Sequence, residues 1–311
     1  MKNKHNKQYR GLIIGPSGIG QVHLREFVKN GIKEVAILGR KFKKNRKINL
    51  ISKDIKRTKI YNLKTFNEIK KFQPKVISIC SPFEKHSEHL LKCKKYCKNF
   101  IVEKPFFWIK NKSEDYNYYY AKKLLKENNF KLFINLPMIS LANQIIYRKK
   151  VFKVKNLKFN YFTSGRHIYN NIAVDLLPHA VSFILALQKK KLKNFKIFSV
   201  NNKKSEWRCR VLINDCNCDF HFKQNKKSKE SKLSFRLNEN FFVRKQVKLN
   251  NEYLTTLVRN KKRIIKVKNP MNEYLKLMLN SFKNDKNIKR NNILALDIMK
   301  LTGKLINFGK N

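Results

Sequence analysis

The chain of 311 residues carries 72 lysines and arginines against 20 aspartates and glutamates, a formal charge of +52 at pH 7. It is too long for one small core and suits two domains of ordinary size, with 42% hydrophobic residues to fill them. The apolar run at residues 12–14 is too short for a signal core, and no stretch approaches the roughly 20 apolar residues of a membrane span, so we expect a soluble, cytoplasmic protein.

The first half of the chain alternates short apolar segments with longer amphipathic ones. Strands are predicted over residues 11–14, 34–38, 59–62, 75–80, 99–102 and 130–135. Between them, helices are predicted over residues 22–30, 65–72, 85–96 and 112–127. Because alternating strands and helices form parallel sheets with right-handed crossovers, this half predicts a doubly wound parallel sheet.

The second half has a different order of elements. A strand at 154–163 precedes an apolar helix at 175–188. Strands without intervening helices are then predicted over residues 195–200, 206–213, 218–222, 232–237 and 241–247, followed by closing helices over 271–284 and 291–306. This order predicts a C-terminal α/β domain with an open, mostly antiparallel sheet. We place the domains at 1–140 and 141–311, with the last helices packing back on one or the other.

A glycine-containing turn follows the first strand. The sequence Gly15-Pro-Ser-Gly-Ile-Gly20 leads from that strand into a helix. Gly15 permits a tight turn, and Gly20 permits close packing of the helix on the strand. The turn, with Ser17, Gly18 and Ile19 at its tip, is predicted to bind the pyrophosphate of a dinucleotide at the helix N-terminus. Ser17 replaces the usual middle glycine, and a plain strand-to-helix loop is the alternative.

The end of the second strand bears on which dinucleotide binds. An NAD-specific site has an acid there that binds the ribose 2′-hydroxyl. In this chain Gly39 takes that place and Arg40 follows. Since a guanidinium suits a 2′-phosphate, we predict NADP as the cofactor, with NAD as the alternative. The competing interpretation is that Arg40 is one more basic surface residue.

The charge and the cysteines each allow two interpretations. The charge indicates either a polyanion partner such as nucleic acid or compositional drift. Basic runs are spread over the whole length instead of one face or arm, which favours drift and no specific nucleic-acid site. The cysteines are predicted to be free thiols in a reducing compartment, with a metal site as the alternative; no paired CxxC pattern occurs among Cys80, Cys93, Cys97, Cys209, Cys216 and Cys218.

Three further motifs recur in a recognisable order. A buried strand ends at Ser81-Pro82 and leads to His86; a later strand ends in Glu103-Lys104-Pro105; and Asp175-Leu-Leu-Pro-His179 opens an apolar helix. Together with the glycine turn, these motifs resemble the glucose–fructose oxidoreductase/inositol 2-dehydrogenase (Gfo/Idh/MocA) family over nearly the whole chain. The resemblance implies a Rossmann domain and an α/β domain whose open sheet often mediates oligomers. It also implies hydride transfer between nicotinamide and a hydroxyl- or carbonyl-bearing carbon of a sugar, cyclitol or sugar nucleotide.

By this resemblance, Lys104 lies at the nicotinamide and substrate, His179 is the acid/base, and Asp175 holds the substrate or orients the imidazole. Alcohol oxidation needs a base near neutral pKa, and an ammonium stabilises a developing alkoxide. Pro178 favours the first turn of a helix, so Asp175 is expected to be its N-cap. Cofactor contacts are implied for Ser81, Pro82, His86, Glu103 and Lys104.

The chain departs from the family pattern, and two rival functions remain. Ser182 stands where the family often has an acid, which puts the identity of the substrate in doubt. One rival is a non-catalytic dinucleotide-binding sensor, against which the presence of both Lys104 and His179 argues. The other is a nucleic-acid-binding protein, which the charge alone suggests.

Overall fold

The structure is a computed structural model. It describes residues 9–39, 58–127, 129–149, 153–228, 231–249, 252–260, 263–282 and 285–310. The chain divides into two compact units. Unit 1 consists of Met1–Lys110, Leu124–Asn135 and Leu275–Lys289, and unit 2 of Asn111–Lys123, Leu136–Tyr274 and Arg290–Asn311.

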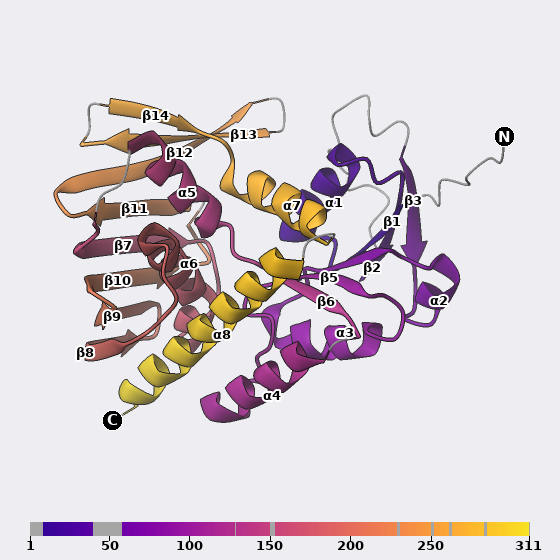
Figure 1. The fold of residues 1–311 in the computed structure, drawn as a ribbon, viewed down its shortest axis with the longest axis horizontal. Helices are drawn as coiled ribbons and strands as arrows, with labels where there is room; N and C mark the ends of the chain where they lie inside the picture. The colour runs from indigo at the N-terminus through magenta and orange to yellow at the C-terminus, as the bar shows by residue number, and fades with distance from the viewer. Residues whose placement is uncertain are drawn as a thin grey trace. The chain divides into compact units, whose positions relative to one another are not determined.

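Unit 1 is built on a six-stranded sheet, called sheet A (Figure 1). Its strands are β1 (Arg10–Ile14), β2 (Glu34–Leu38), β3 (Lys59–Leu63), β4 (Val76–Ile79), β5 (Asn99–Glu103) and β6 (Lys131–Asn135). The strands pair in parallel in the order β3-β2-β1-β4-β5-β6. The order in which successive strands are added reverses between β1 and β4, and doubly wound sheets bind ligands at this point, beyond the carboxyl ends of their strands. The predicted Rossmann-type sheet is confirmed.

Helices occupy the connections of sheet A. They are α1 (Ile19–Lys29), α2 (Glu68–Phe72), the short 3₁₀ helix η2 (Phe83–Lys85), α3 (His86–Cys93) and α4 (Glu114–Lys126). The central strands β1 and β4 are buried along their apolar runs, as expected for parallel strands covered on both faces. Helix α1 packs on β1 and β4, so the segment that follows the glycine turn is fixed to the middle of the sheet.

Unit 2 contains an eight-stranded sheet, called sheet B, in the order β14-β13-β12-β11-β7-β10-β9-β8. Its strands are β7 (Asn156–Thr163), β8 (Phe195–Lys203), β9 (Glu206–Ile213), β10 (Cys216–Gln224), β11 (Lys232–Leu237), β12 (Asn240–Leu249), β13 (Glu252–Arg259) and β14 (Arg263–Val267). Only β7 and β10 pair in parallel, which confirms the predicted open, mostly antiparallel sheet. Strands β13 and β14 were not predicted from the sequence.

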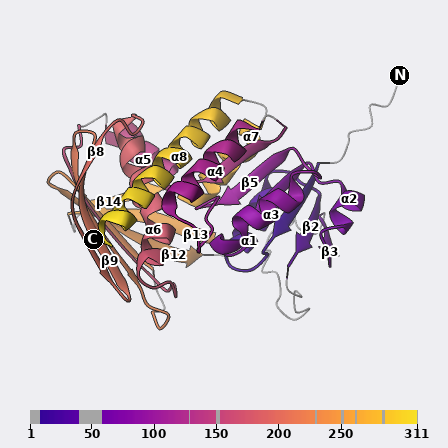
Figure 2. The same ribbon diagram turned by 90° about the horizontal axis from the view of Figure 1, so that it is seen from below.

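Two helices, α5 (Met138–Lys149) and α6 (Asn170–Gln188), lie on one face of sheet B (Figure 2). The α6 side chain of Phe183 contacts Phe159 of β7 and Phe235 of β11, so this face is the apolar core of unit 2. Helix α5 was not predicted. The closing helices are α7 (Pro270–Ser281) and α8 (Asp285–Phe308).

The start of α6 corrects two expectations. The helix begins at Asn170, five residues before the predicted start, so Asp175 lies inside it and is not an N-cap. Its first apolar residues, Ile172 to Val174, are buried. We attribute the longer helix to this burial. It offsets the free-energy cost of an interior proline such as Pro178, which is roughly 3 kcal/mol. Helix α6 also has the length and hydropathy of a membrane span, contrary to expectation, although 72% of that window is buried.

Candidate functional site

The glycine turn has a backbone that only glycine adopts easily. Gly15 and Gly18 have φ of +82° and +55°. A Cβ at Gly15 would lie 2.6 Å from the Ser81 amide nitrogen, and one at Gly20 would lie 2.1 Å from the Gly15 oxygen. The turn is thus packed tightly against the end of β4 on one side. A Cβ on Gly18 would have no atom within 4 Å, so the tip of the turn is open.

The N-terminus of α1 suits an anion. No side chain caps the helix at Gly18, and its first turn contains no acid. An uncapped helix N-terminus beside an open, positive-φ glycine is the backbone arrangement that binds phosphate groups. The turn at Gly15, Ser17, Gly18, Ile19 and Gly20 therefore fits the pyrophosphate of a dinucleotide.

Gly39, in the place of the NAD-specific acid, has a packing role. A Cβ there would lie 2.7 Å from Cδ of Pro16, so the glycine lets the end of β2 approach the turn. Close packing against Pro16 therefore accounts for the absence of an acid at this position. Arg40 lies outside the described residues.

The segment after β4 is held by His86. This imidazole is 1% exposed, and its Nδ1 and Nε2 lie 2.8 Å from the Pro105 carbonyl oxygen and 2.7 Å from that of Ser81. Burial lowers the pKa of His86, while both carbonyl contacts favour its charged form. His86 thus links the Ser81-Pro82 segment to the Glu103-Lys104-Pro105 segment from inside unit 1. A direct cofactor contact by Ser81, Pro82 or His86 stays a prediction.

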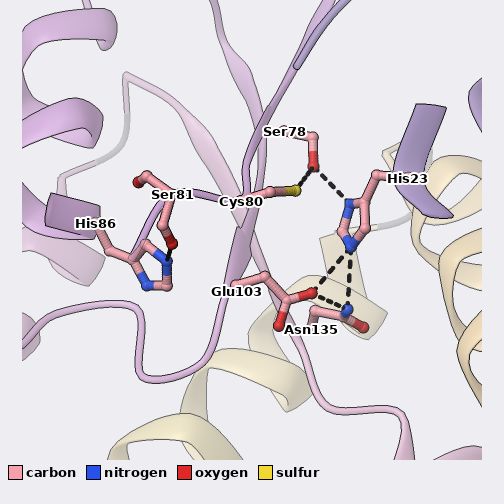
Figure 3. A network of polar contacts seen from close by, with 7 residues as sticks. All are labelled: His23, Ser78, Cys80, Ser81, His86, Glu103 and Asn135. Carbon is pink, nitrogen blue, oxygen red and sulfur yellow. Dashed lines mark hydrogen bonds and ion pairs between the residues drawn. The ribbon is translucent and has the colours of Figure 1, made fainter. Parts of the chain in front are cut away.

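A buried polar network connects α1 to three strands of sheet A (Figure 3). His23 on α1 is fully buried; its Nδ1 lies 2.6 Å from Ser78 Oγ on β4, and its Nε2 lies 2.9 Å from Glu103 Oε1 at the end of β5. Asn135, the last residue of β6, donates to the same Glu103 oxygen. Cys80 Sγ extends the network 3.5 Å beyond Ser78. The network ties the helix of the glycine turn to the carboxyl ends of β4, β5 and β6.

The charges of this network stabilise each other. Burial alone would lower the pKa of His23, but Cys80 and the Glu103 carboxylate raise it to about 10. Burial opposes ionisation of Glu103, yet the hydrogen bond and charge of His23 bring its pKa below the ordinary value. Both shifts favour an imidazolium–carboxylate pair, in which each charge stabilises the other. The sequence did not reveal this pair, although His23 follows Gly20 by three residues on the helix face directed at the sheet.

Lys104 follows β5 between two anchored residues. The Glu103 carboxylate before it is bound by His23 and Asn135, and the Pro105 carbonyl after it is bound by His86. The peptide bond between Lys104 and Pro105 is cis. The backbone at Lys104 is thus fixed from both sides by buried groups. This gives Glu103 a structural role; its predicted cofactor contact stays a prediction.

Helix α6 of unit 2 exposes two functional groups from an otherwise buried surface. Between residues 172 and 185, only Asp175 and His179 are not buried. The His179 ring lies edge-on to Tyr161 of β7, with centroids 5.4 Å apart. Gln224 at the end of β10 donates to Asp175 Oδ2 over 2.6 Å. One turn of helix thus presents a carboxylate held by an amide and an imidazole packed on a phenol.

A backbone contact supports the Asp175 side. Gln224 Oε1 accepts a hydrogen bond from the His167 amide over 2.7 Å, which leaves its Nε2 directed at Asp175. A Cβ at Gly165 would lie 2.2 Å from that oxygen, so a side chain there would displace the Gln224 amide. Among the residues that the structure describes, no three His, Cys, Asp or Glu side chains gather into a metal-binding group.

The predicted site residues thus fall in two groups. The glycine turn, Ser81, His86, Glu103 and Lys104 belong to unit 1, and Asp175 and His179 belong to unit 2. Within each unit the residues converge as described above. That Lys104 and His179 flank one substrate stays a prediction.

Comparisons with known proteins agree with this architecture. Residues 9–135 match the model of an oxidoreductase family with an NAD-binding Rossmann fold, Gfo/Idh/MocA. No curated protein sequence matches the chain significantly.

Solved structures resemble nearly the whole chain. UDP-N-acetylglucosamine 3-dehydrogenase from Acidithiobacillus ferrooxidans has a TM-score of 0.63 at 10% identity, covering 95% of this chain and 96% of that one. A 3-ketoreductase from Actinomadura kijaniata in complex with TDP-benzene and NADP has a TM-score of 0.65 at 8% identity, covering 94% and 95%. The WlbA dehydrogenase from Thermus thermophilus in complex with NAD and UDP-GlcNAcA has a TM-score of 0.58 at 12% identity, covering 95% and 94%. At these identities the likeness concerns the fold alone, whereas the sequence of residues 9–135 matches the Gfo/Idh/MocA family of oxidoreductases.

Proposed function

We propose that the chain is an NADP-dependent oxidoreductase that moves a hydride between nicotinamide and a hydroxyl- or carbonyl-bearing carbon of a small polyhydroxylated substrate. The observation that carries the proposal is the surface of α6, where Asp175 and His179 alone are partly exposed over residues 172–185. A family oxidoreductase has no structural need for a partly exposed carboxylate and imidazole on its core helix. An acid/base function accounts for both.

The residues divide the chemistry between them. A bound nicotinamide supplies the hydride donor or acceptor. In the oxidation direction, His179 removes the proton of the substrate hydroxyl, and Asp175, held by Gln224, binds a neighbouring hydroxyl or steadies the imidazole. The Lys104 ammonium stabilises the alkoxide as it develops. In the reduction direction, His179 returns the proton to the carbonyl oxygen.

Sugars, cyclitols and sugar nucleotides are the substrate class that we propose. Two of the similar structures support it by name: one is a UDP-N-acetylglucosamine dehydrogenase, and another was determined with UDP-GlcNAcA. The test is turnover of NADP or NADPH with a panel of such compounds. A protein that binds the dinucleotide but turns over none of them would instead be the non-catalytic sensor.

We predict that NADPH binds more tightly than NADH, because the end of β2 offers Gly39 and Arg40 in place of an acid. Calorimetric titration of both cofactors at one salt concentration measures the difference. Arg40→Ala should weaken NADPH binding and leave NADH binding nearly unchanged. Arg46→Ala, in the same basic stretch, is the control and should change neither. Equal affinities in the unsubstituted protein would contradict the preference.

We further propose a homo-oligomer that forms through the open face of sheet B, opposite α5 and α6. That face exposes Phe198, which is 47% accessible. Sedimentation of the unsubstituted protein and of Phe198→Glu tests it: the proposal expects an oligomer that the glutamate substitution dissociates.

We also propose that the protein is cytoplasmic, in agreement with six buried cysteines that are all free thiols. We propose no specific nucleic-acid partner.

A further inference from the structure

One row of side chains crosses the covered face of sheet B, on which α6 packs. Pairing aligns Trp207, Phe222, Tyr161, Leu233, Arg244 and Leu257 across six neighbouring strands. Four residues of the row are fully buried: Trp207, Phe222, Leu233 and Leu257. Arg244 of β12 is the exception: it places a cation in a row where alternation along the strand calls for an apolar side chain.

The surroundings of Arg244 lack an anion. Its guanidinium carbon lies 5.5 Å from the centroid of the Tyr161 ring, and its Nε is buried with no hydrogen-bond partner. Among the described residues, no carboxylate forms an ion pair with it. Thr255, on the neighbouring strand β13, also has a buried Oγ1 without a partner. A buried guanidinium nitrogen without an acceptor costs free energy, so an acceptor on a bound ligand would stabilise it.

Arg244 and His179 share a neighbour. Both contact the Tyr161 ring, at 5.5 Å for the guanidinium carbon and 5.4 Å for the imidazole centroid. Both residues are partly exposed, whereas Leu233, between Arg244 and Tyr161 in the row, is not. The guanidinium and the imidazole therefore lie around the same phenol ring, no farther apart than the sum of these two distances.

We propose that Arg244 binds an anionic group, a carboxylate or a phosphate ester, carried by the substrate on which His179 acts. This rests on the proposed function, because it assumes that His179 faces the substrate. It narrows the substrate class from polyols in general to acidic ones. The planar guanidinium forms two parallel hydrogen bonds with either group, and Tyr161 fixes its plane by stacking.

The test measures binding and not turnover. The full-length protein saturated with NADP is titrated at fixed physiological salt with neutral D-glucose and with three anionic probes: D-glucuronate, D-glucose 6-phosphate and UDP-N-acetylglucosamine. The proposal expects at least one anionic probe to bind more tightly than glucose, by about 10- to 100-fold, the usual effect of a charge-assisted hydrogen bond. The glucuronate and phosphate arms separate the two anion sources.

Arg236→Met is the matched control for Arg244→Met. Arg236, on β11, also lies over an aromatic ring, that of Phe241, but its Cβ is on the opposite face of the sheet. Arg244→Met should abolish the preference for the anionic probe, Arg244→Lys should restore it in part, and Arg236→Met should retain it. Unchanged NADP binding in all three variants shows that they are folded.

Two results would overturn the assignment. The first is unsubstituted protein that binds none of the anionic probes more tightly than glucose at millimolar concentrations. The second is an equal loss in Arg244→Met and Arg236→Met, which would reduce the effect to net charge. Either result leaves the role of His179 standing, because that role is tested by turnover.

Discussion

Replacing His179 with alanine should lower turnover by about two to four orders of magnitude, the range for loss of a general acid/base. Cofactor affinity should survive, because the glycine turn and His179 belong to different units. The measurement is the change in nicotinamide absorbance with the best substrate of the sugar panel, together with calorimetric titration of NADPH. His221→Ala is the control, since His221 contacts Phe162 and Glu206 on sheet B, away from α6.

Lys104→Ala should cause a loss of similar size, with Lys104→Arg recovering part of it if charge at the oxyanion is what matters. Its neighbours remain anchored by His23 and His86, so the fold should persist. Full turnover in either alanine variant, with cofactor binding intact, would remove that residue from the mechanism and favour the sensor function.

Breaking the buried His23–Glu103 pair should destabilise unit 1 by about 3–5 kcal/mol, because one charge is left without its partner. His23→Leu and Glu103→Leu each test it. The variant His23→Leu/Glu103→Leu, which removes both charges, should cost less than the sum of the single losses. Urea denaturation followed by Trp108 fluorescence in a Trp207→Phe background reports unit 1 alone, since these are the two tryptophans of the chain.

The control for that experiment is the exposed pair Lys92–Glu88 on α3. Glu88→Gln should cost less than about 1 kcal/mol. Equal effects of Glu88→Gln and Glu103→Leu would contradict a buried, mutually dependent pair.

The same pair sets a pH window for stability. His23 has a pKa raised from 6.5 to about 10, so its contribution is complete below 6.5 and is lost as pH rises through about 10. Glu103 has a pKa lowered from 4.5, so its contribution is complete above 4.5 and is lost as pH falls through the lowered value. The free energy of unfolding should therefore differ most between the unsubstituted protein and the double variant that lacks both charges from pH 4.5 to pH 6.5. The difference should shrink at lower and at higher pH.

Periodicity was enough to predict most of sheet A. Its strands are continuous apolar runs bounded by turns, and such runs are distinctive in sequence. Strand β2 occupies the predicted residues 34–38. The start of α6 was wrong because a proline signal was weighed without the tertiary burial of Ile172 to Val174, which no local pattern contains.

The elements and site residues that were missed depend on long-range contacts. Strands β13 and β14 are mixed polar and apolar segments that are defined by their pairing, β13 with β12 and β14 with β13. His23 looks like a surface histidine until the helix is placed on sheet A beside Glu103, 80 residues later. Arg244 looks like one more basic residue until the register sets it in the same cross-strand row as Tyr161. The order of motifs along the sequence was enough to identify candidate site residues. The neighbours of these residues became known only from the packing and strand pairing in the structure.

The most direct measurement of the central claim is a crystal structure of the protein with NADP bound. The proposed function predicts the pyrophosphate on the backbone of Gly15 to Gly20, and the Lys104 ammonium and His179 imidazole on one side of the nicotinamide, close enough to flank a single sugar ring. A structure with Lys104 and His179 facing different ligands, or with the dinucleotide bound away from the glycine turn, would contradict it.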